Sequence, residues 1–404
     1  MASIRFVCVS FAVLVAAGSA HAQTAPGRRI DVAVTGGVTF DDNVARASEQ
    51  RARQTGLVAE DLVFRPAVSV DVFLPLGGQS LALRGSAGYD IHARNTRLDR
   101  ERVQLGSTLG LRFGRCDGSV NGVFRRQQTD LSNLAFGNPF LVGNQVRNTE
   151  TFTTVTGSLA CGSRIGFRPT GSVTQSFGRN SNNFYRFSNF DSTSVTAGVE
   201  YSGPGFGTLT VYGGYTNSNY PNRRFLLGPG RDGFETKTIS ARLQRQIGAR
   251  LSGSIEGGYT DVSSKRAGSR GFSGLTASAD LVARVNDRLQ VSGALARQVN
   301  ASNVLGAEYV ISRLISLGAS YAVSERMTVD AGAAWNARDL RGSPLLAIPT
   351  IGDDRTSTIH AGVRYGFPRR LQLSVRAERA RRNADFDVFD YTSNRAIVSA
   401  RLGL

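Results

Sequence analysis

The sequence predicts an all-β protein, a transmembrane antiparallel up-and-down β-barrel of about 18 strands, with 16 strands also compatible. Three observations support this fold class. Strand-length segments alternate apolar and polar residues along most of the 404-residue chain, the connections alternate between short and long, and no window after the amino terminus has a convincing helical period. A period of two places one set of side chains on each face of a sheet. Short turns at one end and long loops at the other are typical of outer-membrane barrels.

The amino terminus has the three parts of a secretory signal peptide within residues 1–22. Arg5 gives a positive region, Phe6 to Ala17 are largely apolar, and Ala20-His21-Ala22 forms a small-x-small cleavage site. A short anchor helix is the weaker alternative, because the apolar run is short and no stop-transfer charges follow. We expect residues 23–404 to form a single barrel domain. Export excludes the cytosol and therefore a nucleic-acid partner, which the formal net charge of +17 would otherwise suggest.

The strands are predicted from their alternation. In the first, Ile30, Val34 and Phe40 share one face and Asp31 and Asp41 the other. The pattern returns at 81–91, 103–113, 251–259, 275–285, 289–299, 327–335, 357–367, 371–377 and 396–404. The 46 glycines are spread through strands as well as turns, which suits a curved, closing sheet. A soluble β-sandwich or propeller is the alternative, but its second face is usually more strongly apolar.

The connections give the strand count. Short turns contain small or polar pairs such as Gly77-Gly78 and Asn286-Asp287. Long polar loops cover roughly 42–58, 92–101, 129–150, 180–191, 217–233, 262–272, 300–307, 338–355 and 384–393. Nine long loops imply eighteen strands with both termini in the periplasm.

The polar phase of the strands carries charges of both signs, which would line a wet lumen. The predicted inward basic residues are Arg65, Arg84, Arg112, Arg125, Arg168, Arg242, Arg284, Arg364, Arg376 and Arg401. The predicted inward acids are Asp31, Asp41, Asp71, Asp90, Glu200, Glu256, Asp280, Asp330 and Glu378. Ten basic against nine acidic residues leave the lumen nearly neutral.

The positive surplus is predicted at the two rims, in short turns such as Arg369-Arg370 and at outer strand ends such as Arg381-Arg382. Basic rims match the phosphates of outer-membrane lipid and lipopolysaccharide, which we expect as partners. Six aromatic residues near strand ends lie in the outward phase, as an interfacial girdle requires: Tyr89, Tyr201, Tyr215, Tyr259, Trp335 and Tyr365. A sugar-stacking lumen would need inward aromatics, and Phe73 and Tyr212 are the few candidates.

The two cysteines of the processed chain are predicted to form a disulfide. Cys116 opens the fifth strand and Cys161 closes the sixth at the same end, in an oxidising compartment. Two free thiols are the alternative. No catalytic residue, metal site or cofactor is predicted. Asp90 and His92 share an inward phase that resembles the Asp-His pair of some outer-membrane hydrolases, but solvated lumen residues are the more economical interpretation. The acidic segments Asp353-Asp354 and 385–390 are too irregularly spaced for a calcium loop.

The exit of the first strand reads Phe40-Asp41-Asp42-Asn43-Val44 and resembles the aromatic-Asp-Asp-Asn-Val segment of the putative β-barrel porin 2 family. Residues 88–102 resemble the second hairpin of that family. These are outer-membrane barrels often encoded beside exopolysaccharide genes. The resemblance implies a link to polysaccharide export and a role for Asp41, Asp42 and Asn43, although an Asx-type turn explains these residues equally well. The last strand alternates to Leu404, where Phe or Trp is usual in such barrels.

We therefore expect a passive outer-membrane channel, not an enzyme, that is associated with export of a surface polysaccharide. Its expected partners include the barrel assembly machinery and polysaccharide-export components. A general diffusion porin for small solutes is the first alternative. An outer-membrane hydrolase that uses His92 or His360 and a structural or adhesive barrel that acts through its loops are the others.

Overall fold

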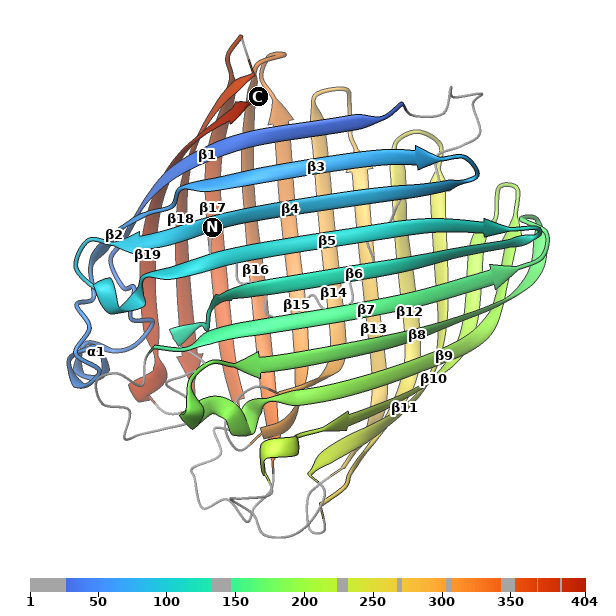
Figure 1. Cartoon of the computed structure of the whole chain (residues 1–404), viewed down its shortest axis with the longest axis horizontal. Coiled ribbons are helices and arrows are strands. Elements are labelled where there is room, and N and C mark those ends of the chain that lie inside the picture. Colours follow the sequence, from blue (N-terminus) through green and yellow to red (C-terminus); the bar gives the residue numbers. More distant parts are fainter. Residues whose placement is uncertain are drawn as a thin grey trace.

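The computed structural model describes residues 27–131, 147–223, 232–266, 271–302, 307–342, 353–368, 370–385 and 387–404, so the predicted signal peptide lies outside the described residues. These residues form one closed antiparallel barrel in which each strand pairs with its neighbours in the sequence and β1 (Arg29–Asp41) pairs with β19 (Tyr391–Gly403). Figure 1 shows β1 to β11 on the near wall and the later strands behind them. The predicted fold class is confirmed, with 18 wall strands.

The strands and their bounds follow the chain in order. Between β1 and β19 they are β2 (Asp61–Phe64), β3 (Ala67–Leu76), β4 (Gln79–His92), β5 (Arg100–Phe113), β6 (Cys116–Gln128), β7 (Thr149–Cys161), β8 (Gly166–Asn180), β9 (Phe190–Gly203), β10 (Gly207–Asn219), β11 (Gly233–Ile247), β12 (Leu251–Ser264), β13 (Phe272–Arg284), β14 (Leu289–Ala301), β15 (Ala307–Ala322), β16 (Met327–Gly342), β17 (Asp353–Gly366) and β18 (Leu371–Ala384).

The second wall strand is made of two pieces, β2 and β3. Both pair with β1, β2 with Val38–Asp41 and β3 with Arg29–Thr35. Pro66 lies between them and has no backbone N–H for the ladder, which interrupts the strand. Arg65 keeps the two pieces in line through its backbone N–H, which donates to the carbonyl of Gly37 at 2.8 Å. Nineteen strand segments therefore build eighteen wall strands.

The two faces of the wall separate as the alternation predicts. Outward side chains such as Leu105, Val195, Ile239 and Leu317 are exposed large apolar groups, as a lipid-facing surface requires. The inward side chains are mostly Ser, Thr and charged residues, and many bond across the strands. Thr156 and Thr174, for example, lie opposite each other with their hydroxyls 3.0 Å apart.

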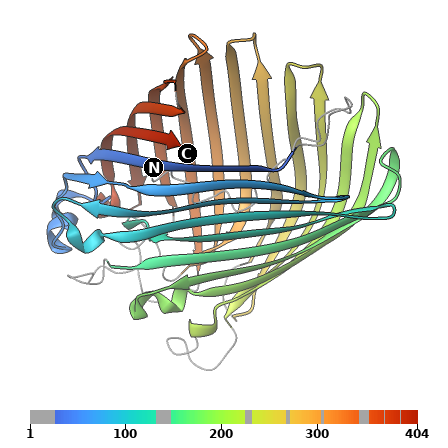
Figure 2. The same ribbon diagram turned by 45° about the horizontal axis from the view of Figure 1, so that its top comes forward.

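The ends of the barrel differ, and we name them the loop end and the turn end (Figure 2). The loop end carries four short helices, α1 (Glu49–Gln54), η1 (Thr96–Leu98), η3 (Asn183–Ser188) and η4 (Pro221–Arg223), and η5 (Asp387–Phe389) follows β18 there. Ala52, Leu57, Leu98 and Tyr185 pack together as a small apolar core between these loops. In the described part of the chain no helix has the length and apolarity to cross a membrane.

Candidate functional site: the lumen and its loop-end constriction

The strand registers place nine of the ten predicted arginines on the inner face of the wall, and the tenth, Arg65, lies between β2 and β3. The register sets Arg84 opposite Asp71 and Arg168 opposite Glu200, and in both pairs the side chains meet, at 2.8 and 2.7 Å. The other predicted arginines on the strands share this phase. Two more of the ten lie within ion-pair distance of an inward carboxylate, Arg65 at 3.7 Å from Asp90 and Arg376 at 2.9 Å from Asp330, and Arg242 stands opposite Glu256 in the register. Arg401 donates a hydrogen bond to Ser69, and Arg125 lies over the ring of Phe152. The side chains of Arg284 and Arg364 are exposed.

An ion-pair cluster lies on the inner wall at the turn end. The carboxylate of Asp117 is 3.3 Å from Arg112, 3.1 Å from Arg164 and 3.5 Å from Arg168, and Arg168 continues to Glu200. These side chains come from β5, β6, β8 and β9 and from the turn before β8. Exposed single ion pairs contribute little, but a network that shares its members orders long side chains at lower entropic cost. The cluster fixes positive and negative groups at the turn-end mouth of the lumen.

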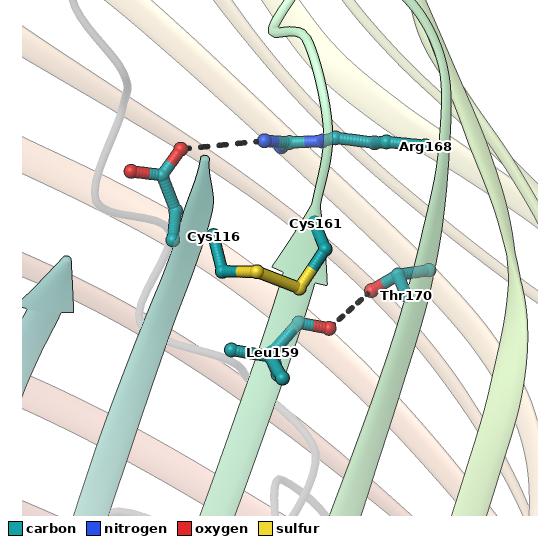
Figure 3. Close-up of a disulfide and its surroundings, with 6 residues drawn as sticks. Cys116, Leu159, Cys161, Arg168 and Thr170 are labelled. Carbon is teal, nitrogen blue, oxygen red and sulfur yellow. Dashed lines mark hydrogen bonds and ion pairs between the residues drawn. A yellow bond between two sulfur atoms is a disulfide. The ribbon is translucent and has the colours of Figure 1, made fainter. Parts of the chain in front are cut away.

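The disulfide lies beside this cluster. Cys116 and Cys161 are directly opposite each other in the β6–β7 register, their Cα atoms are 4.0 Å apart, and the structure joins them in a disulfide (Figure 3). Their phase is the outward one, since Asp117 on β6 and Ala160 on β7 face inward. The covalent bond therefore braces the lipid-facing side of the turn end while the ion pairs brace its inner side.

A second charged cluster is buried in the inner wall at the loop end. Asp354 on β17 accepts a hydrogen bond from Arg338 on β16 at 2.8 Å and forms an ion pair with Arg382 on β18 at 2.5 Å. The side chains of Asp354 and Arg382 are each 1 % exposed. The predicted inward residue Glu378 pairs with Arg395 on β19. The sequence placed Arg382 at the rim of the barrel, and this prediction is wrong, because the side chain is buried in the inner wall. Strands β17 and β18 extend farther than predicted, and Arg382 takes the inward phase of β18.

The family-like motif closes the barrel. Asp41 accepts from the backbone N–H of Asn43 at 3.0 Å, which is an Asx-type turn, and from the hydroxyl of Ser393 at 2.9 Å. Asp42 accepts from both the backbone and side-chain N–H groups of Asn394, and the amide of Asn43 donates to the carbonyl of Thr392. Apart from the contact within the turn, each of these hydrogen bonds joins the end of β1 to the start of β19. Phe40 faces outward and is exposed, and Val44 packs against the loop core.

The wall opens between β13 and β14 near the loop end. The β13–β14 pairing runs only from Arg284–Gln290 to Ala277–Arg297, whereas β13 pairs with β12 up to Phe272 and β14 pairs with β15 up to Ala301. Five residues of β13 therefore have no partner on the β14 side. The guanidinium of Arg297 lies over the ring of Phe272, which belongs to the inner face of β13. The outer face of β14 thus meets the inner face of β13.

The free end of the β14–β15 hairpin lies inside the barrel. Ile315 and Ile311 share the outward phase of β15, yet Ile315 is 53 % exposed and Ile311 only 4 %. Ile311 and Tyr309 pack with side chains from the inner faces of β7, β9, β11 and β12, namely Phe152, Phe190, Phe234 and Val262. The hairpin end has therefore moved behind its neighbours, and its normally lipid-facing side is buried against the inner wall.

Hydrogen bonds to the hairpin backbone hold it there. The hydroxyl of Tyr220, which follows β10 and is 1 % exposed, lies 2.8 Å from the carbonyl of Ser302 and 2.6 Å from that of Glu308. It also accepts from the backbone N–H of Ser302 at 2.9 Å. Arg223 in η4 donates to the carbonyl of Ala307 at 2.8 Å and covers the Tyr220 ring at 3.6 Å. Periodicity cannot predict this constriction, because the residues of the hairpin end keep the pattern of a wall strand.

The two histidines of the described chain lie on separate strands. His92 at the end of β4 is buried and its Nδ1 lies 3.3 Å from Asp99, while its predicted partner Asp90 lies within 4 Å of Arg65 and Arg102. His360 on β17 lies 3.8 Å from Asp330. No group of three metal-ligating side chains occurs in the described ranges, and Asp353 and Asp354, considered for calcium, begin β17.

Comparison with known proteins gives distant likenesses. No curated protein matches the sequence. The chain is similar to OccK2 (OpdF) of Pseudomonas aeruginosa in complex with glucuronate, with 14 % identity over 94 % of this chain and 100 % of that chain and a TM-score of 0.48. It is also similar to OccAB3 of Acinetobacter baumannii, with 10 % identity, and to a BenF-like porin from Pseudomonas fluorescens Pf-5, with 13 % identity. Both matches cover 93 % of this chain and 99 % of the other chain and have a TM-score of 0.46.

A family model matches residues 227–404, from just before β11 to the carboxy terminus. The motif at residues 40–44 lies outside this range, so the match is independent of the residues on which the resemblance was based. The family is described as putative beta-barrel porin 2, which confirms that resemblance over these residues, and the fold is that of a porin-like outer-membrane β-barrel.

Proposed function

We propose that the protein is a passive diffusion channel for small polar and charged solutes, with its loop end at the cell surface and both termini in the periplasm. The observation that carries this proposal is the inner wall, where hydroxyl groups and paired charges line the lumen along its length. Such a surface stays hydrated and offers no single strong binding site. The inward β14–β15 hairpin narrows the loop end and favours small solutes over large ones.

The distribution of charge supports weak ion selectivity. Most inward carboxylates, such as Asp71, Glu200 and Asp330, lie within 4 Å of an inward arginine. The electric fields of two opposite charges this close together largely cancel, and salt in the lumen screens what remains. The channel should therefore pass small anions and cations at comparable rates.

The inward aromatic residues also favour small solutes. Tyr212 donates its hydroxyl to Glu256 at 2.6 Å, and the inward rings at the loop end pack among themselves around Tyr309. Phe73 lies at the turn end of β3. In the described ranges these positions form no continuous aromatic track along which a sugar polymer could stack.

Reconstitution into planar bilayers tests the proposal. We expect stepwise currents in KCl and a reversal potential near zero under a KCl gradient, and we expect liposomes with the protein to swell in small sugars faster than in large ones. Folded protein that gives no current under any voltage or salt condition would contradict it.

Export of a surface polysaccharide, which the family resemblance implies, stays a prediction, as do contacts with lipid, lipopolysaccharide and the barrel assembly machinery. Deleting the gene and measuring surface polysaccharide separates the two functions. Unchanged polysaccharide together with reduced uptake of small solutes favours diffusion. Loss of polysaccharide that the wild-type gene restores favours export.

A further inference from the structure

Four arginines on the outer face of the barrel lie together at the loop end. They are Arg313 on β15, Arg355 on β17 and Arg379 and Arg381 on β18, and we name them the arginine face. All four are exposed. Their strands show which side they occupy, because Ile315, Ile359 and Val375, which share their phases, are exposed apolar residues of the lipid-facing surface.

The registers bring these arginines close together. Ala337 on β16 stands between Arg313 on one side and Arg355 on the other, so two cationic side chains flank one small residue. Neighbouring strands are about 4.8 Å apart, which places the two Cα atoms roughly 10 Å from each other. Arg381 is opposite Ser357, one row nearer the membrane centre, and Arg379 is opposite Ile359, one row deeper again.

These side chains have no carboxylate partner at ion-pair distance among the described residues. Within the described residues, the side-chain hydrogen bond that one of them makes runs from Arg381 to the amide oxygen of Asn383 at 3.2 Å. The row farther out holds Asp339 and Asp353, and Asp339 already pairs with Arg341. The sector therefore keeps a positive surplus on its outer surface.

The other side of the barrel shows that this surplus is not a general feature of the rim. There, the outward Arg126 pairs with Glu101 at 2.7 Å, the outward Arg179 pairs with Asp191, and Lys237 stands opposite Asp261. Outward charge near the loop end is thus paired from β5 to β12, whereas from β15 to β18 the outward arginines outnumber the outward carboxylates.

We propose that the arginine face binds the phosphate groups of lipid A, the membrane anchor of lipopolysaccharide. Trp335 lies in the row of Arg381, at the depth where aromatic residues mark the head-group region. A guanidinium matches a phosphate through two parallel hydrogen bonds and stays charged in this region. The proposal rests on the orientation given above, since only the outer leaflet contains lipid A.

Binding of purified lipid A to the folded barrel in detergent tests the proposal. We compare the wild type with a variant that carries Arg313→Gln, Arg355→Gln, Arg379→Gln and Arg381→Gln. The attraction of one arginine to an anionic membrane surface corresponds to about fivefold in affinity, so we expect a loss of roughly 600-fold for the four together. Dephosphorylated lipid A should bind the wild type as weakly as phosphorylated lipid A binds this variant.

Matched controls keep the result interpretable. A variant with Arg126→Gln and Arg179→Gln removes two outward arginines that have carboxylate partners, and it should bind lipid A like the wild type. A heat-shift gel establishes that each barrel is folded. Equal binding by the wild type and the fourfold variant, an equal loss in the control variant, or equal affinity for phosphatidylglycerol would overturn the assignment to lipid A.

The same proteins separate this inference from the proposed function. The fourfold variant leaves the inner wall unchanged, so its conductance in planar bilayers should equal that of the wild type. A wild type that conducts but does not bind lipid A refutes the inference alone. A wild type that binds lipid A but does not conduct refutes the channel alone.

Discussion

The hydroxyl of Tyr220 lies 2.6 Å from the backbone carbonyl of Glu308, 88 positions later, and donates to it. The same hydroxyl is 2.8 Å from the carbonyl of Ser302, so its one proton serves two acceptors at the two ends of the β14–β15 connection. Burial raises the pKa of Tyr220, which keeps the hydroxyl protonated and able to donate. One side chain thus holds both ends of the hairpin inside the lumen.

Tyr220→Phe should loosen the hairpin and enlarge the channel. The substitution keeps the ring but removes the partner of three backbone groups, each worth about 1 kcal/mol. We expect higher single-channel conductance and faster proteolysis between Ala301 and Ala307. Tyr215→Phe, which changes an outward tyrosine of β10, is the matched control and should conduct like the wild type. Identical currents from both variants would show that Tyr220 does not set the constriction.

Ile311 and Ile315 offer a comparison within one strand. Ile311 is buried in the apolar cluster against the inner wall and Ile315 is exposed on the lipid-facing side. Ile311→Ala should leave a cavity that weakens hairpin docking by about 2–4 kcal/mol and should raise conductance or open-channel noise. Ile315→Ala removes the same atoms from the outer surface and should leave the current unchanged. A current that responds equally to both substitutions would place the hairpin end outside the lumen.

Asp354→Asn should destabilise the loop end of the barrel. The carboxylate lies between Arg338 and Arg382, and removing its charge takes away the acidic group that pairs with both guanidinium groups in the wall. Breaking a buried pair costs about 3–5 kcal/mol. We expect a lower temperature of unfolding on heat-shift gels and a reversal potential shifted toward anion selectivity. Asp280→Asn, at an inward carboxylate without an ion pair in the described ranges, should change the unfolding temperature little.

The disulfide should matter for stability and not for conduction. Its loop spans 45 residues, for which chain entropy gives about 4 kcal/mol as an upper value. Replacing Cys116 and Cys161 by serine should lower the unfolding temperature and leave single-channel conductance unchanged, because both side chains face outward. Reducing agent should lower the unfolding temperature of the wild type alone. A response of the serine variant to the reductant would assign the effect to something other than this bond.

The sequence predicts the wall of this barrel better than its mouth. Alternation fixes the phase of each strand, and a correct phase is enough to place Arg84, Arg168 and Arg376 on the inner face. Loop lengths give the strand number, because each long polar segment interrupts the alternation. Both signals are local, so one sequence suffices to read them.

The parts that the sequence does not predict depend on contacts between distant strands. Arg382 and Asp354 stand 28 positions apart and meet because β17 and β18 continue beyond the strand ends that the alternation predicts. The inward hairpin is harder still to predict, since Ile311 keeps the period of a lipid-facing residue and differs from one by its burial in the apolar cluster that includes Phe234. Periodicity shows which face of a strand a side chain occupies, but it does not show whether the strand itself stands in the wall or lies inside the lumen.

The motif at the end of β1 gives the last prediction. Asp42 accepts two hydrogen bonds from Asn394, so Asp42→Ala removes a link that closes β1 against β19. If the motif is structural, this variant should unfold at a lower temperature and conduct normally once folded, since its side chain makes no contact with the constriction. Asp387→Ala, at an exposed acidic residue in another loop-end connection, is the control and should keep the stability of the wild type. A variant that folds with wild-type stability but loses transport would instead assign Asp42 to a solute, because only a binding role would alter transport without altering closure.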